Sequence, residues 1–251
     1  MVSNARLLVR IAASLIAVAG LLVALTIKLP EIAFSQDQVV YEVIVTNLTR
    51  GQRFTPILVA THKESVRLFE LGSPASAQLR TLAEEGDTGP LAALLASMPE
   101  VKDVVTSTPP PPASNLIDPG ESITLTVETS EAFDHVSVAA MLIPTNDGFF
   151  ALNGVAGPNS ELTLFSPAYD AGTERNDESC GSIPGPGFIE CVTPANPDGN
   201  GGGAMVGEGE GYVHIHAGIH GVGGELPTSN LNPSLRDWRN PVAKITIRRI
   251  R

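Results

Sequence analysis

The sequence predicts an all-β fold, an antiparallel sandwich that carries a short helical insertion. After residue 38, short runs of apolar and β-branched residues recur along the chain, and turn-forming residues separate them. Helical patterns occur in one place, between residues 73 and 99. Strands and helices do not alternate as they would in parallel βαβ units, so we expect antiparallel pairing.

The first half of the chain predicts two strands and two helices. Residues 38–48 are rich in β-branched side chains, and residues 57–61 form a second apolar run. Ser73 and Pro74 fit the N-cap and first position of a helix, and Gly86 marks its end. Gly89 and Pro90 begin a second short helix. Both helices therefore lie in a long connection between strands.

The second half of the chain predicts further strands. It begins after a proline-rich stretch, residues 109–112, which we expect to be extended and exposed. The glycine-rich and proline-rich residues 181–211 predict a loop. The predicted strands cover residues 123–127, 135–143, 149–152, 162–165, 212–216 and 242–250.

The first 35 residues have the pattern of an export signal. Arg6 and Arg10 precede an uncharged apolar run, and small residues around Ser35 fit a cleavage site. That run of about 17 residues approaches the length of a membrane span, so an uncleaved N-terminal anchor is the alternative. We expect residues 36–251 to form one exported domain, attached to a membrane only if residues 1–35 remain.

Cysteine usage and charge agree with export. Cys180 and Cys191 are the only cysteines, and two cysteines in an oxidising compartment predict one disulfide. The formal net charge of −11 argues against a nucleic-acid partner, because phosphates would be repelled. An acidic surface instead suits divalent cations.

Three acidic residues form the candidate metal site. Asp147 follows an apolar strand-like run, and Asp170 and Glu174 lie together after another. Oxygen donors on adjoining loops, with glycines that let the backbone curl, are what Ca²⁺ requires. Solvated acidic turns are the alternative interpretation. Asp177 and Glu178 are reserve ligands on the same loop.

Histidines give a second candidate. Alternate residues of a strand share a face, so His214 and His216 would project together, and His220 follows. Three imidazoles with an open position suit catalytic zinc or copper. A polar strand face that hydrogen-bonds to the next turn is the alternative. No nucleophile elbow or phosphate-binding loop is present, so the sequence does not predict an enzyme.

Three segments resemble the spondin N-terminal domain family: residues 47–49, residues 141–153, and Tyr-Asp-Ala-Gly-Thr-Glu at 169–174. The resemblance extends from about residue 38 to 250. The helical insertion and the His-Ile-His segment at 214–216 look like the exported bacterial branch of that family. It implies a C2-like β-sandwich with calcium at one end. It also implies that Asp147, Asp170 and Glu174 are the carboxylate ligands, with glutamate replacing the usual aspartate at 174.

The combined prediction is an exported calcium-binding β-sandwich that acts as an adhesion or ligand-binding module at the cell surface or in the envelope. Its partner would be a cell-surface or extracellular ligand, which the sequence does not identify. The competing hypothesis is a zinc or copper enzyme centred on His214, His216 and His220. A structural envelope protein in which calcium only orders a loop is a third.

Overall fold

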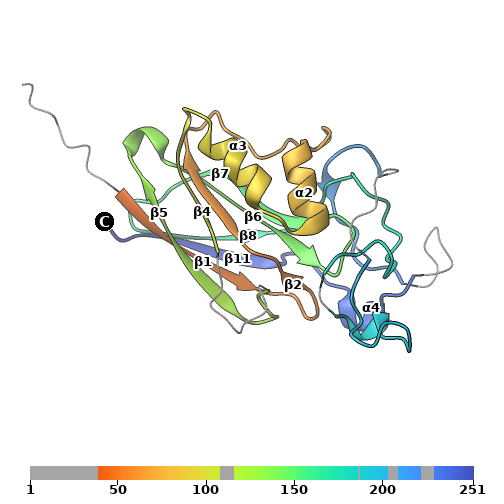
Figure 1. Ribbon diagram of the computed structural model, residues 1–251. Helices are drawn as coiled ribbons and strands as arrows, with labels where there is room; N and C mark the ends of the chain where they lie inside the picture. The colour runs from red at the N-terminus through yellow and green to blue at the C-terminus, as the bar shows by residue number, and fades with distance from the viewer. Residues whose placement is uncertain (1–38, 108–115, 186, 203–208, 222–228) are drawn as a thin grey trace, which may run out of the picture. The chain divides into compact units, whose positions relative to one another are not determined.

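Two antiparallel sheets pack face to face in the computed structural model (Figure 1), as the sequence predicts. The structure describes residues 39–107, 116–185, 187–202, 209–221 and 229–251. All of them belong to one unit, Asp37–Arg251. The predicted export signal and the proline-rich stretch at 109–112 lie outside the described residues.

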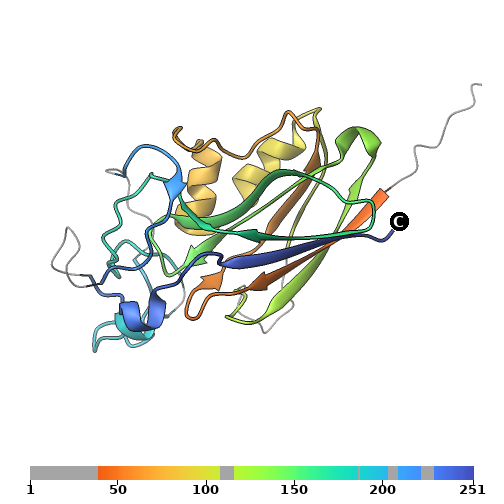
Figure 2. The same cartoon turned by 180° about the vertical axis from the view of Figure 1, so that it is seen from behind.

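The first sheet has four strands in the order β5-β1-β11-β8. Figure 2 shows the C-terminal strand, β11, lying between β1 and β8. In β1 every second residue is buried, because one face covers the core while the other meets solvent. The strands are β1 (Val39–Asn47), β5 (Ser122–Thr129), β8 (Glu161–Ser166) and β11 (Ala243–Arg249).

The second sheet has seven strands, six in the order β10-β9-β7-β6-β3-β4 and a short β2 that also pairs with β6. Its strands are β2 (Arg53–Phe54), β3 (Leu58–His62), β4 (Val101–Thr106), β6 (His135–Ile143), β7 (Gly148–Ala156), β9 (Ala168–Asp170) and β10 (His214–Ile215). The predicted strand at 212–216 is thus shorter than expected, and β4 has no counterpart among the predicted strands.

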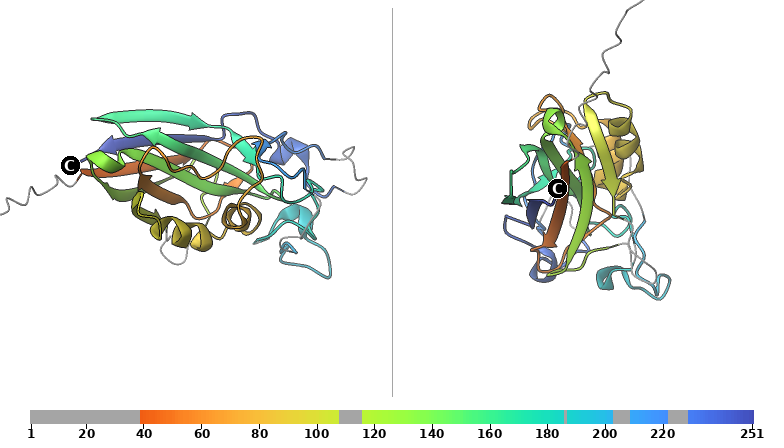
Figure 3. Two further views of the ribbon diagram at one scale, coloured as in Figure 1. Left: turned by 90° about the horizontal axis from the view of Figure 1, so that it is seen from above. Right: turned by 90° about the vertical axis from the view of Figure 1, so that its left-hand side faces the viewer.

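Strand β6 is buried on both faces. One face contributes Val138 and Ala140 to the core between the sheets. The other face contributes Ala139 to a second cluster, where the leucines of α2 (Ala77–Glu85) and α3 (Gly89–Ala96) cover the sheet. Figure 3 shows these helices outside the second sheet. Double coverage explains why β6 is almost continuously apolar.

The helical insertion follows β3, as predicted, but it is followed by the unpredicted strand β4, and the start of its first helix differs. Ser76 is the N-cap of α2, since its side chain accepts a hydrogen bond from Leu79 N at 3.1 Å, so the assignment of Ser73 was wrong. Gly86 ends the helix in the left-handed conformation, as predicted. A third short helix, α4 (Pro233–Arg236), was not predicted.

The disulfide between Cys180 and Cys191 is present and confirms the predicted pairing. It closes a loop beside the short 3-10 helix η2 (Ile189–Cys191).

Within the described ranges, no helix is long and apolar enough to cross a membrane.

Candidate functional site

The candidate site lies at one end of the second sheet, where three strands meet. Gly148, the first residue of β7, pairs with Asp170 of β9, and Asp170 pairs in turn with His214 of β10. Asp147 directly precedes β7, and its carbonyl accepts a hydrogen bond from Ala171 N at 3.2 Å. The strand register therefore brings Asp147 close to Asp170, although the two residues lie on different loops of the predicted site.

Asp147 is fully buried. Its Oδ2 accepts hydrogen bonds from Thr173 N at 2.7 Å and from Glu174 N at 3.2 Å. Its Oδ1 is buried and has no hydrogen-bond partner among the described residues. A buried carboxylate oxygen without a partner is costly, and a bound cation or a proton would remove that cost.

Asp170 is also fully buried. Oδ1 accepts from Gly172 N at 2.8 Å, and Oδ2 accepts from Asn176 Nδ2 at 2.7 Å. Burial, together with the charge of Asp170, raises the pKa of Asp147 to about 8. An ionised Asp147 is therefore costly here unless a positive charge lies beside it.

Two glycines allow a distant segment to lie against this loop. Gly172 has φ +66°, and a Cβ there would lie 2.2 Å from the carbonyl oxygen of Tyr212. A Cβ on Gly209 would lie 2.4 Å from the carbonyl oxygen of Gly172. Only glycine tolerates such close approach. The chain from Gly209 to His214 is thereby held over Asp170.

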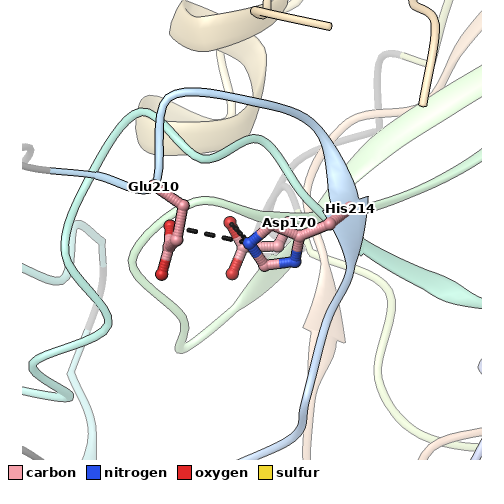
Figure 4. A group of neighbouring side chains, drawn as sticks. All are labelled: Asp170, Glu210 and His214. Atoms are coloured by element: carbon pink, nitrogen blue, oxygen red, sulfur yellow. Dashed lines mark ion pairs between the residues drawn. The ribbon is translucent and has the colours of Figure 1, made fainter. Parts of the chain in front are cut away.

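This crossing forms a cluster of Asp170, Glu210 and His214 (Figure 4). One ligand atom from each side chain lies within 4.8 Å of the other two. Nε2 of His214 is 3.6 Å from Asp170 Oδ1 and 3.6 Å from Glu210 Oε2. Burial alone would lower the pKa of His214, but Asp170, the Ile215 carbonyl and Glu210 together raise it.

His214 and His216 both face Asp170, as their alternate spacing predicts. Nε2 of His216 is 4.0 Å from Asp170 Oδ2, and its Nδ1 accepts from Gly218 N at 3.0 Å. Burial lowers the pKa of His216. His220 is exposed. Among the described residues, the cluster of ligand atoms includes neither His216 nor His220.

The reserve ligands Asp177 and Glu178 have structural partners. Oδ1 of Asp177 accepts from Asn146 Nδ2 at 3.0 Å and from Ser179 N at 2.9 Å. Both oxygens of Glu178 accept hydrogen bonds, from the backbone N–H groups of His220 and Gly221 and from Ser229. These carboxylates therefore hold loops together.

Glu174 is 2% exposed, and its backbone N–H donates to Asp147 Oδ2, but among the described residues the cluster of ligand atoms includes neither Asp147 nor Glu174. Glu210 was missed by the sequence prediction, because it lies in a glycine-rich loop without strand periodicity. The sequence feature that could have indicated Glu210 as a ligand was its spacing of four residues from His214. A pocket of about 250 Å³ opens here, lined among others by Asp170, Glu210 and His214.

Comparison with known protein families identifies the family of this chain. The Spondin_N family model matches residues 46–175, more than half of the chain. The chain belongs to the spondin N-terminal domain family. The matched region contains Asp147, Asp170 and Glu174 and ends before Glu210 and His214. The spondin N-terminal domain is a non-enzymatic domain type. No match was found among curated proteins.

Proposed function

We propose that this spondin-type domain is an exported calcium-binding module that serves adhesion or ligand binding. The family and the β-sandwich both fit a ligand-binding module. The disulfide and the family together favour an exported protein, since disulfides persist in oxidising compartments. The periplasm, the cell surface and the medium all fit this proposal.

The unpartnered Oδ1 of Asp147 is the observation that carries the calcium proposal. Ionised Asp147 suffers a desolvation penalty and is repelled by Asp170. A divalent cation offsets both costs, and carboxylate oxygens are the ligands that Ca²⁺ prefers. Asp147, Asp170 and Glu174 would hold the ion, with backbone carbonyls and water as further ligands.

A proton on Asp147 is the competing hypothesis, because it would also remove the buried charge. Thermal unfolding separates the two. If calcium binds only the folded state, it stabilises the full-length chain by about 2.7 kcal/mol at 100 times its dissociation constant. Identical melting temperatures in calcium and in chelator would favour the proton. Potassium at matched ionic strength is the control for general screening.

A bound calcium ion would tie together the chain segments on either side of Asp147 and Asp170. We propose that this end of the sandwich then presents a fixed surface to a cell-surface or extracellular ligand. A pull-down with the full-length chain, with and without chelator, tests the proposal. Partners retained only in calcium support it, and an identical set in both conditions contradicts a calcium-dependent surface.

A further inference from the structure

We propose that Asp170, Glu210 and His214 form a second metal site, for a divalent transition-metal ion of the zinc type. The ligand set differs from that of the calcium proposal and shares only Asp170 with it. Glu210 and His214 lie outside the region that the family model matches. The proposal therefore rests on two residues that the family model does not cover, and it does not depend on calcium binding.

The tautomer of His214 suits metal binding. Its Nδ1 lies 3.1 Å from the carbonyl oxygen of Ile215, which can only accept a hydrogen bond. Nδ1 therefore carries a hydrogen, and whenever the ring is neutral its Nε2 presents a lone pair toward both carboxylates. Histidines that bind metals have this arrangement, in which the other ring nitrogen donates to a carbonyl.

The separations within the cluster fit a metal ion better than direct hydrogen bonds. At 3.6 Å, His214 Nε2 is too far from Asp170 Oδ1 and Glu210 Oε2 for good hydrogen bonds. Two ligands that each lie about 2.0–2.1 Å from a tetrahedral zinc ion are roughly 3.3–3.4 Å apart. The two separations from His214 Nε2 are thus close to the spacing of ligands around one such ion, and all three ligand atoms lie within 4.8 Å of one another.

His216 is an independent observation that points to the same place. Its side chain is only 2% exposed, and its Nε2 has no hydrogen-bond partner in the described part of the chain. Because Nδ1 accepts from Gly218 N, Nε2 carries the hydrogen and is directed toward Asp170, 4.0 Å away. His216 therefore places an unpartnered, buried N–H group beside Asp170, and His216 is not one of the three proposed ligands.

Asn176 supports the same pair of carboxylates. Its Nδ2 lies 2.7 Å from Asp170 Oδ2 and 3.4 Å from Glu210 Oε1, and it donates to both. A donor that bridges two carboxylates keeps them in place while a cation lies between them. The arrangement resembles the outer hydrogen bonds that orient metal ligands.

Ligand chemistry selects the class of ion. Calcium prefers an all-oxygen shell, whereas an imidazole with two carboxylates suits zinc and its neighbours. The cluster lines a pocket of about 250 Å³, which leaves room for water or an external ligand at the remaining position. The structure thus assigns an open three-residue site and not a closed structural one.

Calorimetric titration of the chelator-treated, full-length chain with Zn²⁺ tests the assignment. Wild type should bind a single zinc ion, and His214→Gln and Glu210→Gln should each weaken binding at least tenfold. His135→Gln is the matched control. His135 lies at the far end of β6 and pairs with Ala156, the last residue of β7. Its variant should bind like wild type.

Three further measurements guard against misfolding and against confusion with the calcium site. Equal melting temperatures of the variants and wild type in chelator show that folding is intact, as expected for partly exposed side chains. Co²⁺ should give a visible absorption band that His214→Gln changes. Asp147→Asn, which removes a calcium ligand only, should keep zinc binding, so the two metal proposals can fail separately. Absence of zinc binding by wild type, or unchanged binding by His214→Gln, overturns the proposal.

Discussion

Asp147 and Asp170 are two fully buried carboxylates on adjoining segments, held together because Gly148 pairs with Asp170. Desolvation and the charge of Asp170 raise the pKa of Asp147 to about 8. A sandwich that needed only a hydrophobic core would not maintain such a pair. Ionising Asp147 carries an electrostatic cost that a bound cation would remove, and this cost should be measurable.

Asp147→Asn should abolish the stabilisation by calcium. Asparagine keeps the shape and one oxygen but removes the charge that the ion would neutralise. In chelator the variant should be at least as stable as wild type, because asparagine removes the cost of desolvating a buried charge and the repulsion with Asp170. Differential scanning calorimetry in calcium and in chelator measures both effects. An unchanged calcium response would exclude Asp147 as a ligand.

Asp170→Asn should weaken calcium binding far more than Asp177→Asn. Asp177 accepts hydrogen bonds from Asn146 and Ser179, so its loss should cost on the order of 1–3 kcal/mol of stability and leave calcium affinity close to wild type. Calorimetric titration with Ca²⁺ compares the affinities, and urea unfolding measures the stabilities. If both variants lost affinity equally, the ion would lie further along the loop.

The sequence predicted strands well where one local pattern dominated. Strand β6 has the predicted limits, since it is almost continuously apolar and turn residues flank it. Strand β4 was missed because it is a half-buried edge strand whose charged Lys102 and Asp103 interrupt its apolar pattern. Ser73 and Ser76 precede the same leucines, and only the side-chain contact of Ser76 distinguishes them.

The site was predictable only in part, for a similar reason. Asp147 and Asp170 follow strand ends, so sheet topology brings them together. Glu210 reaches Asp170 through the close contact between Gly209 and Gly172, which are far apart in the chain. No pattern in the local sequence predicts that the segments around Gly209 and Gly172 cross.

Replacing both cysteines by serine should destabilise the domain by about 2–3 kcal/mol, because the bridge restricts the unfolded chain across a short loop. Cys180 and Cys191 are separated by 11 residues. The midpoint of guanidinium unfolding, compared with that of oxidised wild type, gives the difference. Equal midpoints would show that the loop contributes nothing to global stability.

Glu190 and Arg236 predict a pH-dependent contribution to stability. Two hydrogen bonds, 2.7 and 2.8 Å long, join their side chains and hold the pKa of Glu190 below its ordinary value. Because the folded pKa lies below the unfolded pKa, the pair stabilises the fold above about pH 4.3, and this is lost as pH falls through the folded pKa.

Glu190→Gln should therefore lower the free energy of unfolding by on the order of 1–2 kcal/mol at neutral pH, where the wild-type pair is charged. The difference should shrink in acid, where wild-type Glu190 is protonated and resembles glutamine. Urea unfolding at neutral and acidic pH provides the comparison. A difference that stays constant across this range would mean that the charge of Glu190 is not what stabilises the loop.

Calcium binding by the buried Asp147–Asp170 pair is tested most directly by equilibrium dialysis. The full-length chain is dialysed against Ca²⁺ and its metal content is then measured by elemental analysis, with wild type and Asp147→Asn side by side. We expect wild type to retain a single calcium ion and Asp147→Asn to retain much less. Wild-type protein that leaves dialysis without calcium would contradict the proposed site, and Asp147 would then be buried as the neutral acid.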